Sequence, residues 1–382
     1  MNFRPDISSR CEPRADDPSA QMSVVFAPDY RAGNPYQSLL AESLKNFGCR
    51  VSFLSDYRRG LPLARGITPA SPDIFHLHWP EYYFKADSPL RRRVRRLRFR
   101  TDLFLASHGR CLAVTAHNLI AHEDKGKLDP LIQFAFRRAD VIFAHSDDSK
   151  LMLIDTLRIR AEKIHLIPCG DLSTSLPPAP DRAAARLRLS LKENEKYALI
   201  FGRLAPYKGI EEIVKYWVNR GISITLVIAG SAEERFGQQL RELTNCGGDR
   251  IQLRLGHIPD AELADWLVGA DCAIFNYPRL LTSGSAALAR SFGLPVLFPA
   301  WLTTADLGEP SSRVFRFAAI DKEFETHLND AVTLSADFDT AADWRETTAW
   351  SIVAKKTFIG YAEALNRTFA GTSRKARPLW MR

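Results

Sequence analysis

Residues 201–219 read FGRLAPYKGIEEIVKYWVN and decide the fold of the second half of the chain. The apolar run YALIF at 197–201 predicts a buried strand, which breaks at Gly202 into a short loop carrying Arg203 and Lys208. Apolar residues then recur at helical spacing, so the loop joins a strand end to a helix N-terminus. Helix N-termini favour anions, and two added cations would suit a diphosphate. We therefore predict a nucleoside diphosphate site here.

The 382 residues exceed one ordinary core and predict two domains of about 150–200 residues each. The contents of 46% hydrophobic and 25% charged residues are typical of a soluble globular protein, and no run of about 18 apolar residues predicts a membrane span. The polar N-terminus lacks the apolar segment of a secretion signal, and the six cysteines form no CxxC pair. We expect a disordered leader, a reducing cytoplasmic compartment and no metal site built from cysteine.

The composition shifts to Pro, Ala, Arg and Lys between the two halves, which marks an interdomain connection. Strands alternate with helices on both sides of it, and this alternation indicates parallel sheets with ligands at the carboxyl edge of the strands. The predicted parts are a leader at 1–21, an N-terminal domain at 22–175, a linker at 176–196, a C-terminal domain at 197–350, and a helix and basic tail at 351–382 that could cross back to the first domain.

Polar and aromatic residues follow three predicted strands of the first half. Because the carboxyl ends of parallel strands meet at one edge, we expect these residues to line the ligand site of that domain. They are Gly33, Asn34 and Tyr36 after the strand 23–27, His78, Trp79 and Glu81 after the strand 74–77, and His117 and Glu123 after the strand 112–116.

A second helix N-terminus in the second half reads TSGS at 282–285. Thr and Ser are good N-cap residues, and Gly lets a ligand approach the backbone closely. A capped helix without a ligand would show the same residues. Because Arg203 and Lys208 belong to the same domain, we predict that the diphosphate is also held by Thr282, Ser283, Gly284 and Ser285.

Seven arginines crowd residues 91–100, interleaved with apolar residues at helical spacing. Such charge runs are usually a solvated helix face. The alternative is a patch for anionic lipid headgroups. Nucleic acid is a further but unlikely partner, since no aromatic platform or nucleic-acid motif accompanies the run. The apolar stripe is Leu90, Val94 and Leu97, and the proposed membrane patch is Arg92, Arg93 and Arg96.

Six short phrases of the second half carry a family resemblance. They are LIPCGD at 166–171, FGR through KG at 201–209, IAG at 228–230, LGHIP at 255–259, AD at 270–271 and FGLPV at 292–296. In this order and spacing they resemble the donor domain of GT-B glycosyltransferases, a class that includes retaining family 4. The resemblance implies an α/β fold with two Rossmann-like doubly wound domains facing a central cleft, an acceptor-binding one followed by a donor-binding one.

The same resemblance implies roles for individual residues. Arg203 and Lys208 would neutralise the donor diphosphate, so no metal cofactor is expected. His117 would lie beside the donor sugar, although a satisfied core histidine is the alternative. The nucleoside would be met by Gly230, His257, Ile258 and Tyr277, and the acceptor by the loop residues Gly33, Asn34, Tyr36, His78 and Trp79.

The chain departs from family 4 where retaining members carry two glutamates eight residues apart, because Leu280 and Leu288 stand there. Its first half, with NPY at 34–36, HLHWPE at 76–81 and HN at 117–118, is similar to bacterial exopolysaccharide GumI-like β-mannosyltransferases. Those enzymes invert a GDP-mannose donor onto a lipid-linked oligosaccharide. This similarity implies mannose transfer, with inversion, to a lipid-linked or saccharide acceptor by a peripheral protein on the inner face of the plasma membrane.

Inversion needs a base for the acceptor hydroxyl. The candidates are Glu81, Glu123 and Asp29, with His78 as a weaker fourth, and we prefer Glu81 because it follows a strand end directly. A surface or capping carboxylate would give the same pattern. His76 alternates inward, and no third ligand at useful spacing follows the two histidines of HLH, so we expect no metal site.

Three other functions remain open at this point. One is a retaining family 4-like transferase that uses a UDP-sugar. The missing glutamate pair suggests a second, a catalytically degenerate nucleotide-sugar-binding protein. A nucleic-acid binder is the third, and only the arginine run supports it.

Overall fold

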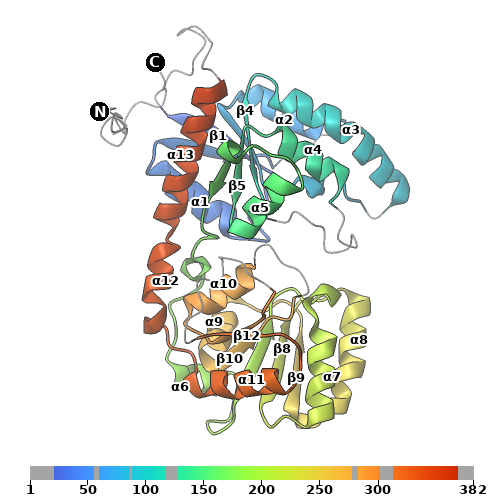
Figure 1. Cartoon of the computed structure of the whole chain (residues 1–382), viewed down its shortest axis with the longest axis vertical. Coiled ribbons are helices and arrows are strands. Elements are labelled where there is room, and N and C mark those ends of the chain that lie inside the picture. Colours follow the sequence, from blue (N-terminus) through green and yellow to red (C-terminus); the bar gives the residue numbers. More distant parts are fainter. Residues whose placement is uncertain are drawn as a thin grey trace. The chain divides into compact units, whose positions relative to one another are not determined.

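The computed structural model describes residues 21–55, 60–86, 88–117, 128–277, 283–301 and 313–368 (Figure 1). These residues form two compact units. Unit 1 comprises the described residues of Met1–Ala144, Ser149–Ile167 and Trp350–Arg382, and unit 2 those of His145–Asp148 and Pro168–Ala349. Each unit is described by itself below.

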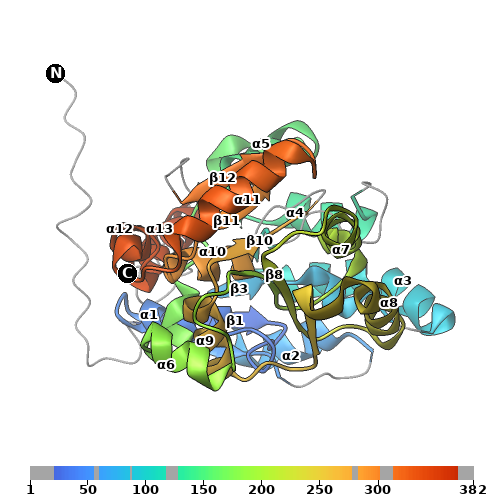
Figure 2. The same cartoon turned by 90° about the horizontal axis from the view of Figure 1, so that it is seen from below.

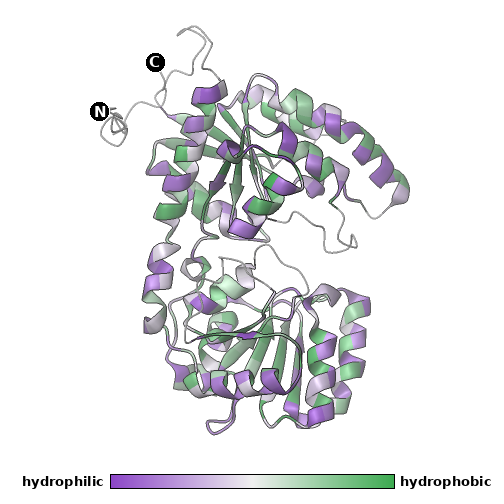
Figure 3. Cartoon of the chain, in the orientation of Figure 1, coloured by the Kyte–Doolittle hydropathy of each residue, from purple (hydrophilic) through white to green (hydrophobic). Residues whose placement is uncertain are grey.

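Unit 1 is built on a six-stranded parallel sheet with the order β2-β1-β3-β4-β5-β6. Its central strands are buried on both faces, as is typical of parallel sheets covered by helices, and Figure 3 shows much of the strands of both units in green. The strands are β1 (Met22–Ala27), β2 (Cys49–Phe53), β3 (Ile74–Leu77), β4 (Cys111–Thr115), β5 (Val141–Ala144) and β6 (Ile164–Leu166).

The helices of unit 1 include one from the far end of the chain. Helix α13 packs beside α1 and on β4, β5 and β6 (Figure 1). A Cβ at Gly360 in α13 would lie 2.6 Å from the Phe143 ring, so a glycine here lets the helix lie close to β5. The helices are α1 (Tyr36–Lys45), α2 (Pro62–Ala70), α3 (Pro89–Ser107), α4 (Pro130–Arg138), most of α5 (Asp147–Asp155), α13 (Trp350–Thr368) and the short 3-10 helices η3 (Pro80–Tyr83) and η4 (Ala161–Lys163).

Unit 2 repeats the architecture with a six-stranded parallel sheet in the order β12-β11-β10-β7-β8-β9. Side chains along β7 alternate between two cores: Leu199 and Phe201 face one, and Ala198 and Ile200 face the other. The strands are β7 (Tyr197–Phe201), β8 (Thr225–Gly230), β9 (Ile251–Leu255), β10 (Cys272–Ile274), β11 (Val296–Pro299) and β12 (Val314–Phe317).

Helices cover both faces of this second sheet. Residues of α6, α9 and α10 contribute to one core, and residues of α7, α8 and α11 to the other. Figure 2 shows α11 lying over β11 and β12. The helices are α6 (Arg182–Arg188), α7 (Ile210–Arg220), α8 (Glu234–Thr244), α9 (Asp260–Gly269), α10 (Gly284–Ser291), α11 (Lys322–Leu334), α12 (Ala342–Thr347) and the short 3-10 helices η5 (Leu172–Ser175), η6 (Pro206–Lys208), η7 (Asn245–Arg250) and η9 (Asp339–Ala341).

The predicted fold class is confirmed, since two doubly wound parallel sheets are present. Residues 176–196, expected as a linker from their composition, instead belong to unit 2. The reason is a buried ion-pair cluster, in which Arg182 and Arg186 of α6 each contact the buried carboxylate of Asp271 at 2.8 Å. In the part of the chain that the structure describes, no helix combines the length and apolar character needed to cross a membrane.

Candidate active site

The carboxyl ends of β7 and β8 in unit 2 approach each other through two glycines. A Cβ added at Gly230, where φ is +152°, would lie 1.7 Å from the carbonyl oxygen of Gly202. Gly202 has φ of +89°, and its amide donates to the carbonyl of Ala229 at 3.1 Å. Only glycine meets both demands, so at this edge two stretches of backbone pack together where another residue would place a side chain.

Lys208 places a buried cation directly over the end of β7. Its Nζ donates to the carbonyl of Phe201 at 3.1 Å and lies 5.6 Å from the centre of the Tyr277 ring. Burial, aided by the nearby charge of Arg203, lowers the pKa of Lys208 to about 8. An anion bound here would offset the burial and favour the charged amine, so Lys208 is a candidate anion-binding group of the site.

The N-terminus of α10 lies against the same glycine. An ideal Cβ at Gly202 would lie 2.8 Å from Ser285 Oγ and 3.6 Å from Lys208 Nζ, so the hydroxyl and the amine flank one position. Ser283 is the N-cap, and its Oγ accepts from the amide of Ala286 at 3.1 Å. Backbone amides, a hydroxyl and a cation therefore converge at the end of β7, as a diphosphate requires. We call Gly202, Lys208, Gly209, Ser283, Gly284 and Ser285 the donor cradle.

Asn276 fixes the other helix of the donor cradle, α7. A Cβ at Gly209, where φ is +63°, would lie 2.4 Å from the carbonyl oxygen of Asn276. The Asn276 side chain donates to the carbonyl of Gly209 at 3.2 Å and to Glu212 Oε2 at 2.9 Å. The first turn of α7 is thereby held beside the loop that carries Lys208.

The remaining donor residues divide into exposed and buried ones. Arg203 is exposed and pairs with Glu233 at 3.0 Å, and His257 is also exposed, while Ile258 is half-buried. Tyr277 is only 2% exposed, and its hydroxyl lies 3.4 Å from Ser283 Oγ. Its buried ring therefore packs against the donor cradle, and its expected contact with the nucleoside stays a prediction.

Aromatic and histidine side chains cluster at the carboxyl edge of the unit 1 sheet, and we call them the ring cluster. Trp79 stacks on His117 with 4.4 Å between ring centres and an angle of 14°. Tyr36 of α1 meets His117 edge-on at 4.8 Å, and Tyr30 contacts Trp79 at 5.1 Å. Of these rings, Trp79 is half-buried and Tyr30 is exposed, so the cluster offers aromatic surface at its rim.

Three histidines, His117, His78 and His76, lie in succession from this edge toward the core of unit 1. His78 Nδ1 lies 3.1 Å from His117 Nε2, a hydrogen bond that joins the ends of β3 and β4. Behind them His76 is fully buried between the Tyr361 hydroxyl at 2.6 Å and Thr115 Oγ1 at 2.7 Å, and burial lowers its pKa well below the usual value. His76 is structural, as its alternation predicted. No group of three His, Cys, Asp or Glu residues suited to a metal ion occurs within the described ranges.

Two of the carboxylates considered as bases differ in environment. Glu81 lies in the first turn of η3, next to the ring cluster, and burial raises its pKa. Asp29 forms a two-pronged ion pair with Arg31, with both contacts at 2.8 Å, and these hydrogen bonds lower its pKa. A general base gains from a pKa raised toward neutrality, so the structure favours Glu81 over Asp29.

The loop between β1 and α1 is held by its own side chains. Asn34 Oδ1 accepts from the amide of Tyr36 at 2.9 Å, which begins the helix. Gln37 is fully buried, accepting from the Tyr30 amide and donating to the Pro28 carbonyl, both at 2.8 Å. Gly33 lies against the Tyr30 ring. Asn34 and Gly33 thus shape the loop that carries Tyr30.

Helix α3 exposes the predicted apolar stripe. Leu90, Val94 and Leu97 are 72%, 52% and 74% exposed, and Figure 3 shows much of the surrounding helix in purple. Arg93 is exposed, whereas Arg96 pairs through both terminal nitrogens with Asp129, the N-cap of α4. Arg96 therefore joins α3 to α4 and is not part of an open patch.

Comparisons with known proteins place this geometry in an enzyme class. Residues 36–171 match the model of Glycosyltransferase Family 4. The chain is 26% identical over 280 residues to the GDP-mannose:glycolipid 4-beta-D-mannosyltransferase of Xanthomonas campestris pv. campestris, covering 70% of each chain. It is also 36% identical over 78 residues to a D-inositol 3-phosphate glycosyltransferase of Kineococcus radiotolerans, covering 20% of this chain and 18% of that protein.

Solved structures agree on the fold. Sucrose-phosphate synthase from Thermosynechococcus elongatus superposes with a TM-score of 0.64 at 16% identity, over 92% of this chain and all of that one. Anabaena HepE in complex with UDP and glucose superposes with a TM-score of 0.60 at 15% identity, over 92% and 99% of the two chains. This chain is a GT-B glycosyltransferase.

The structure brings some of the predicted site residues of this glycosyltransferase together and leaves others apart or undescribed. The structure brings Lys208, Ser283, Gly284 and Ser285 together in unit 2, and His78, Trp79, His117 and Tyr36 in unit 1. Leu288 is buried in a hydrophobic core. Glu123, Thr282 and Leu280 lie outside the described residues. The sequence did not single out Gln37 and Asn276 as residues that hold the site loops. The only signal for them was a polar residue inside or directly after an apolar run.

Proposed function

We propose that this glycosyltransferase moves mannose from GDP-mannose, with inversion and without a metal ion, to a lipid-linked or growing saccharide acceptor. One observation carries the proposal: the chain matches a GDP-mannose:glycolipid 4-beta-D-mannosyltransferase over 70% of both chains. The donor cradle and the ring cluster supply the two kinds of chemistry that such a transfer needs.

The donor cradle suits the departing diphosphate. As the bond between the sugar C1 and the diphosphate oxygen breaks, negative charge grows on that oxygen. Lys208 and the hydroxyl of Ser285 flank one position at the N-terminus of α10, where backbone amides also favour an anion. These groups stabilise the leaving GDP without a bound cation, and Arg203 adds an exposed charge at the rim.

We assign the proton transfer to unit 1. In an inverting reaction the acceptor oxygen bonds to C1 while the C1–diphosphate bond breaks, and the hydroxyl proton passes to Glu81. Burial raises the pKa of Glu81, which strengthens it as a base near neutral pH. Trp79 and Tyr30 offer apolar faces on which an acceptor sugar can stack.

Helix α3 is our proposed contact with an anionic membrane surface, on the cytoplasmic side of the plasma membrane. It combines an exposed stripe of Leu90, Val94 and Leu97 with arginines on its flanks. Substituting Leu90→Ser and Leu97→Ser, or Arg91→Glu and Arg93→Glu, should reduce sedimentation with vesicles that contain phosphatidylglycerol. Unchanged sedimentation in both pairs would return α3 to a solvated helix face.

A retaining transferase that uses a UDP-sugar is the second candidate. It is favoured by the similarity of fold to Anabaena HepE, whose structure holds UDP and glucose. Leu288 in a core position argues against the sugar contacts of retaining family 4 enzymes. A degenerate, nucleotide-binding protein would keep the donor cradle and lack turnover.

Two readouts on the purified protein separate these functions. GDP should raise the melting temperature more than UDP or ADP at equal concentration, because ligand binding to the native state stabilises it. With GDP-mannose and a glycolipid acceptor, proton NMR should show a β-linked product. A preference for UDP with an α-linked product would establish the second candidate, and nucleotide binding without any product would establish the degenerate one.

A further inference from the structure

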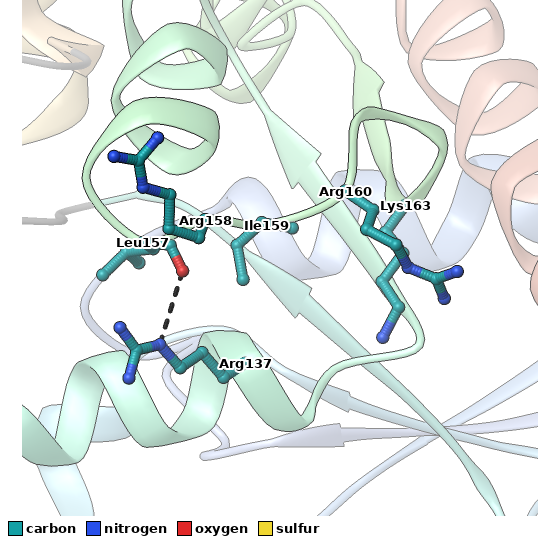
Figure 4. A pocket seen from close by; sticks show the side chains of 6 residues that line it. All are labelled: Arg137, Leu157, Arg158, Ile159, Arg160 and Lys163. Atoms are coloured by element: carbon teal, nitrogen blue, oxygen red, sulfur yellow. Dashed lines mark hydrogen bonds between the residues drawn. The ribbon is translucent and has the colours of Figure 1, made fainter.

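A basic pocket lies at the amino edge of the unit 1 sheet. It has a volume of about 260 Å³ and is lined by Arg137, Leu157, Arg158, Ile159, Arg160 and Lys163 (Figure 4). These residues directly precede β5 and β6 in the chain. The ring cluster of His78, Trp79 and His117 follows the carboxyl ends of β3 and β4, so it belongs to the opposite edge of the same sheet. We call the six residues the basic pocket.

Backbone contacts hold two of the four cations in place. Arg137 Nε donates to the carbonyl of Leu157 at 3.4 Å, and Lys163 Nζ donates to the carbonyl of Ala139 at 2.7 Å. In Figure 4, Arg137 and Arg158 lie on one side of Ile159, and Arg160 and Lys163 on the other. Side chains that are already ordered lose less conformational entropy when a ligand binds, so this arrangement favours an anion.

The charge of the basic pocket is only partly balanced. Two carboxylates accompany the four cations: Glu162 pairs with Arg160 at 3.1 Å, and Asp140 accepts from the amide of Leu112 at 2.9 Å. Four positive and two negative charges leave a net charge of about +2. Burial lowers the pKa of Lys163; Asp140 opposes this shift, and Arg160 and Arg367 add to it. A bound anion would offset both the repulsion and the burial.

Arg158 is the unusual member of the basic pocket. Its φ is 55°, a left-handed conformation that glycine adopts more readily than arginine. Within the described residues its side chain forms no hydrogen bond or ion pair, and it is exposed. Arginine thus occupies a backbone position that favours glycine, while its guanidinium is not used by the fold. An outlier of this kind is a reason to look for a ligand.

We propose that the basic pocket binds a phosphate or diphosphate group, as a second anion site separate from the donor cradle. Pockets for drug-sized ligands measure about 300–1,000 Å³, so the basic pocket suits a small anion better than a whole nucleotide. Arginine pairs with phosphate oxygens through two nitrogens at once, and three arginines line the site. The phosphate is either free in solution or the exposed end of a lipid headgroup.

Calorimetric titration of the full-length protein with inorganic pyrophosphate tests this proposal. The wild type should bind two equivalents, one in the donor cradle and one in the basic pocket. Arg158→Gly/Arg160→Ala should lose one equivalent and keep its melting temperature, because glycine favours the φ of residue 158. Lys208→Met should lose the other. Arg50→Ala/Arg241→Ala, which removes two exposed arginines elsewhere, should keep both.

The outcomes separate this proposal from the proposed function. If the Arg158→Gly/Arg160→Ala protein still binds as much pyrophosphate as the wild type, the basic pocket is not an anion site. If Lys208→Met changes nothing while the pocket variant loses its equivalent, the basic pocket stands and the donor assignment fails. Sedimentation with vesicles of phosphatidic acid in phosphatidylcholine shows whether the bound phosphate belongs to a lipid or is free in solution. Weaker sedimentation of the pocket variant indicates a lipid headgroup, and equal sedimentation indicates a free phosphate.

Discussion

The two sheets are both six-stranded and parallel, but their carboxyl edges differ in residue type. Aromatic and histidine rings form the edge in unit 1, and glycine backbone forms it in unit 2. In unit 1 the space after the strands is filled by the rings of His78, Trp79 and His117. In unit 2 the corresponding edge is formed by the closely packed backbones of Gly202 and Gly230, where no other side chain would fit. Packed rings offer stacking surfaces and protons, while bare backbone beside a cation offers an anion site. One architecture therefore supports two chemistries.

The difference arises from what each loop requires of its backbone. Glycines in unit 2 adopt φ values that other residues avoid, and a Cβ would strike neighbouring backbone atoms. In unit 1 the loop after β1 is instead held by the side chains of Asn34 and Gln37. Side-chain bonds can adjust to a substitution, whereas a backbone collision cannot. The following predictions test this contrast in order of expected effect.

Glu81→Gln should lower kcat by about 10²–10⁴-fold, because an amide cannot accept the acceptor proton. Nucleotide binding should be unchanged, since it is assigned to unit 2. In the wild type, kcat should fall as pH drops through the pKa of Glu81, which burial raises above 4.5, because the base works only when deprotonated. Steady-state kinetics across pH measure this. Glu42→Gln, at an exposed position of α1, is the control, and equal turnover of both variants would remove Glu81 from the mechanism.

Gly230→Ala should destabilise the protein by about 2–4 kcal/mol, because its Cβ would lie 1.7 Å from the Gly202 carbonyl oxygen. Gly33→Ala should cost less than about 1 kcal/mol, since its Cβ would meet a Tyr30 ring carbon at 3.2 Å and that side chain can rotate. Urea unfolding monitored by circular dichroism measures both. Equal losses in the two variants would contradict the contrast between the edges.

Lys208→Met should weaken nucleoside diphosphate binding about 10–100-fold, because it removes a charge-assisted contact from a site that excludes water. Lys215→Met, which removes an exposed lysine from α7, should bind like the wild type. Isothermal titration with GDP gives both constants. If the two variants bind alike, the diphosphate is not held by the donor cradle.

Nucleotide affinity should be constant below pH 8 and should fall above it, by up to about tenfold for each pH unit. The sign follows from the pKa of about 8 for Lys208 in the ligand-free protein: above that pH, binding an anion requires the uptake of a proton. Titrations at pH 7 and pH 9 measure the change, and Lys208→Arg should abolish it. A flat profile for the wild type would mean that Lys208 is already charged at pH 9.

The sequence predicted best where one local pattern decides the structure. Strand, glycine and lysine occur in order at 197–208, and their positions followed from propensity and from the known preference of anions for helix N-termini. The burial of Tyr277 did not follow from the sequence, because whether an aromatic residue after a strand points in or out depends on the partners it meets. In this case the partner is Ser283.

Charged residues were the hardest to interpret from the sequence. Arg96 looked identical to its neighbours in the arginine run, yet Asp129, thirty-three positions later, holds it. Residues 182–188 looked like part of a linker, and Asp271 ties them to unit 2. An ion pair between distant positions leaves no periodic trace, so composition alone could not separate structural arginines from exposed ones.

The sequence by itself determined two doubly wound sheets and the place of the loop that carries Lys208, because hydrophobic periodicity and glycine positions are local properties of the chain. Only the tertiary structure decided which groups act together. The bond between His78 and His117, the convergence of Ser285 with Lys208, and the basic pocket before β6 each join segments far apart in the chain. Burial and distance set their chemistry, and both depend on packing.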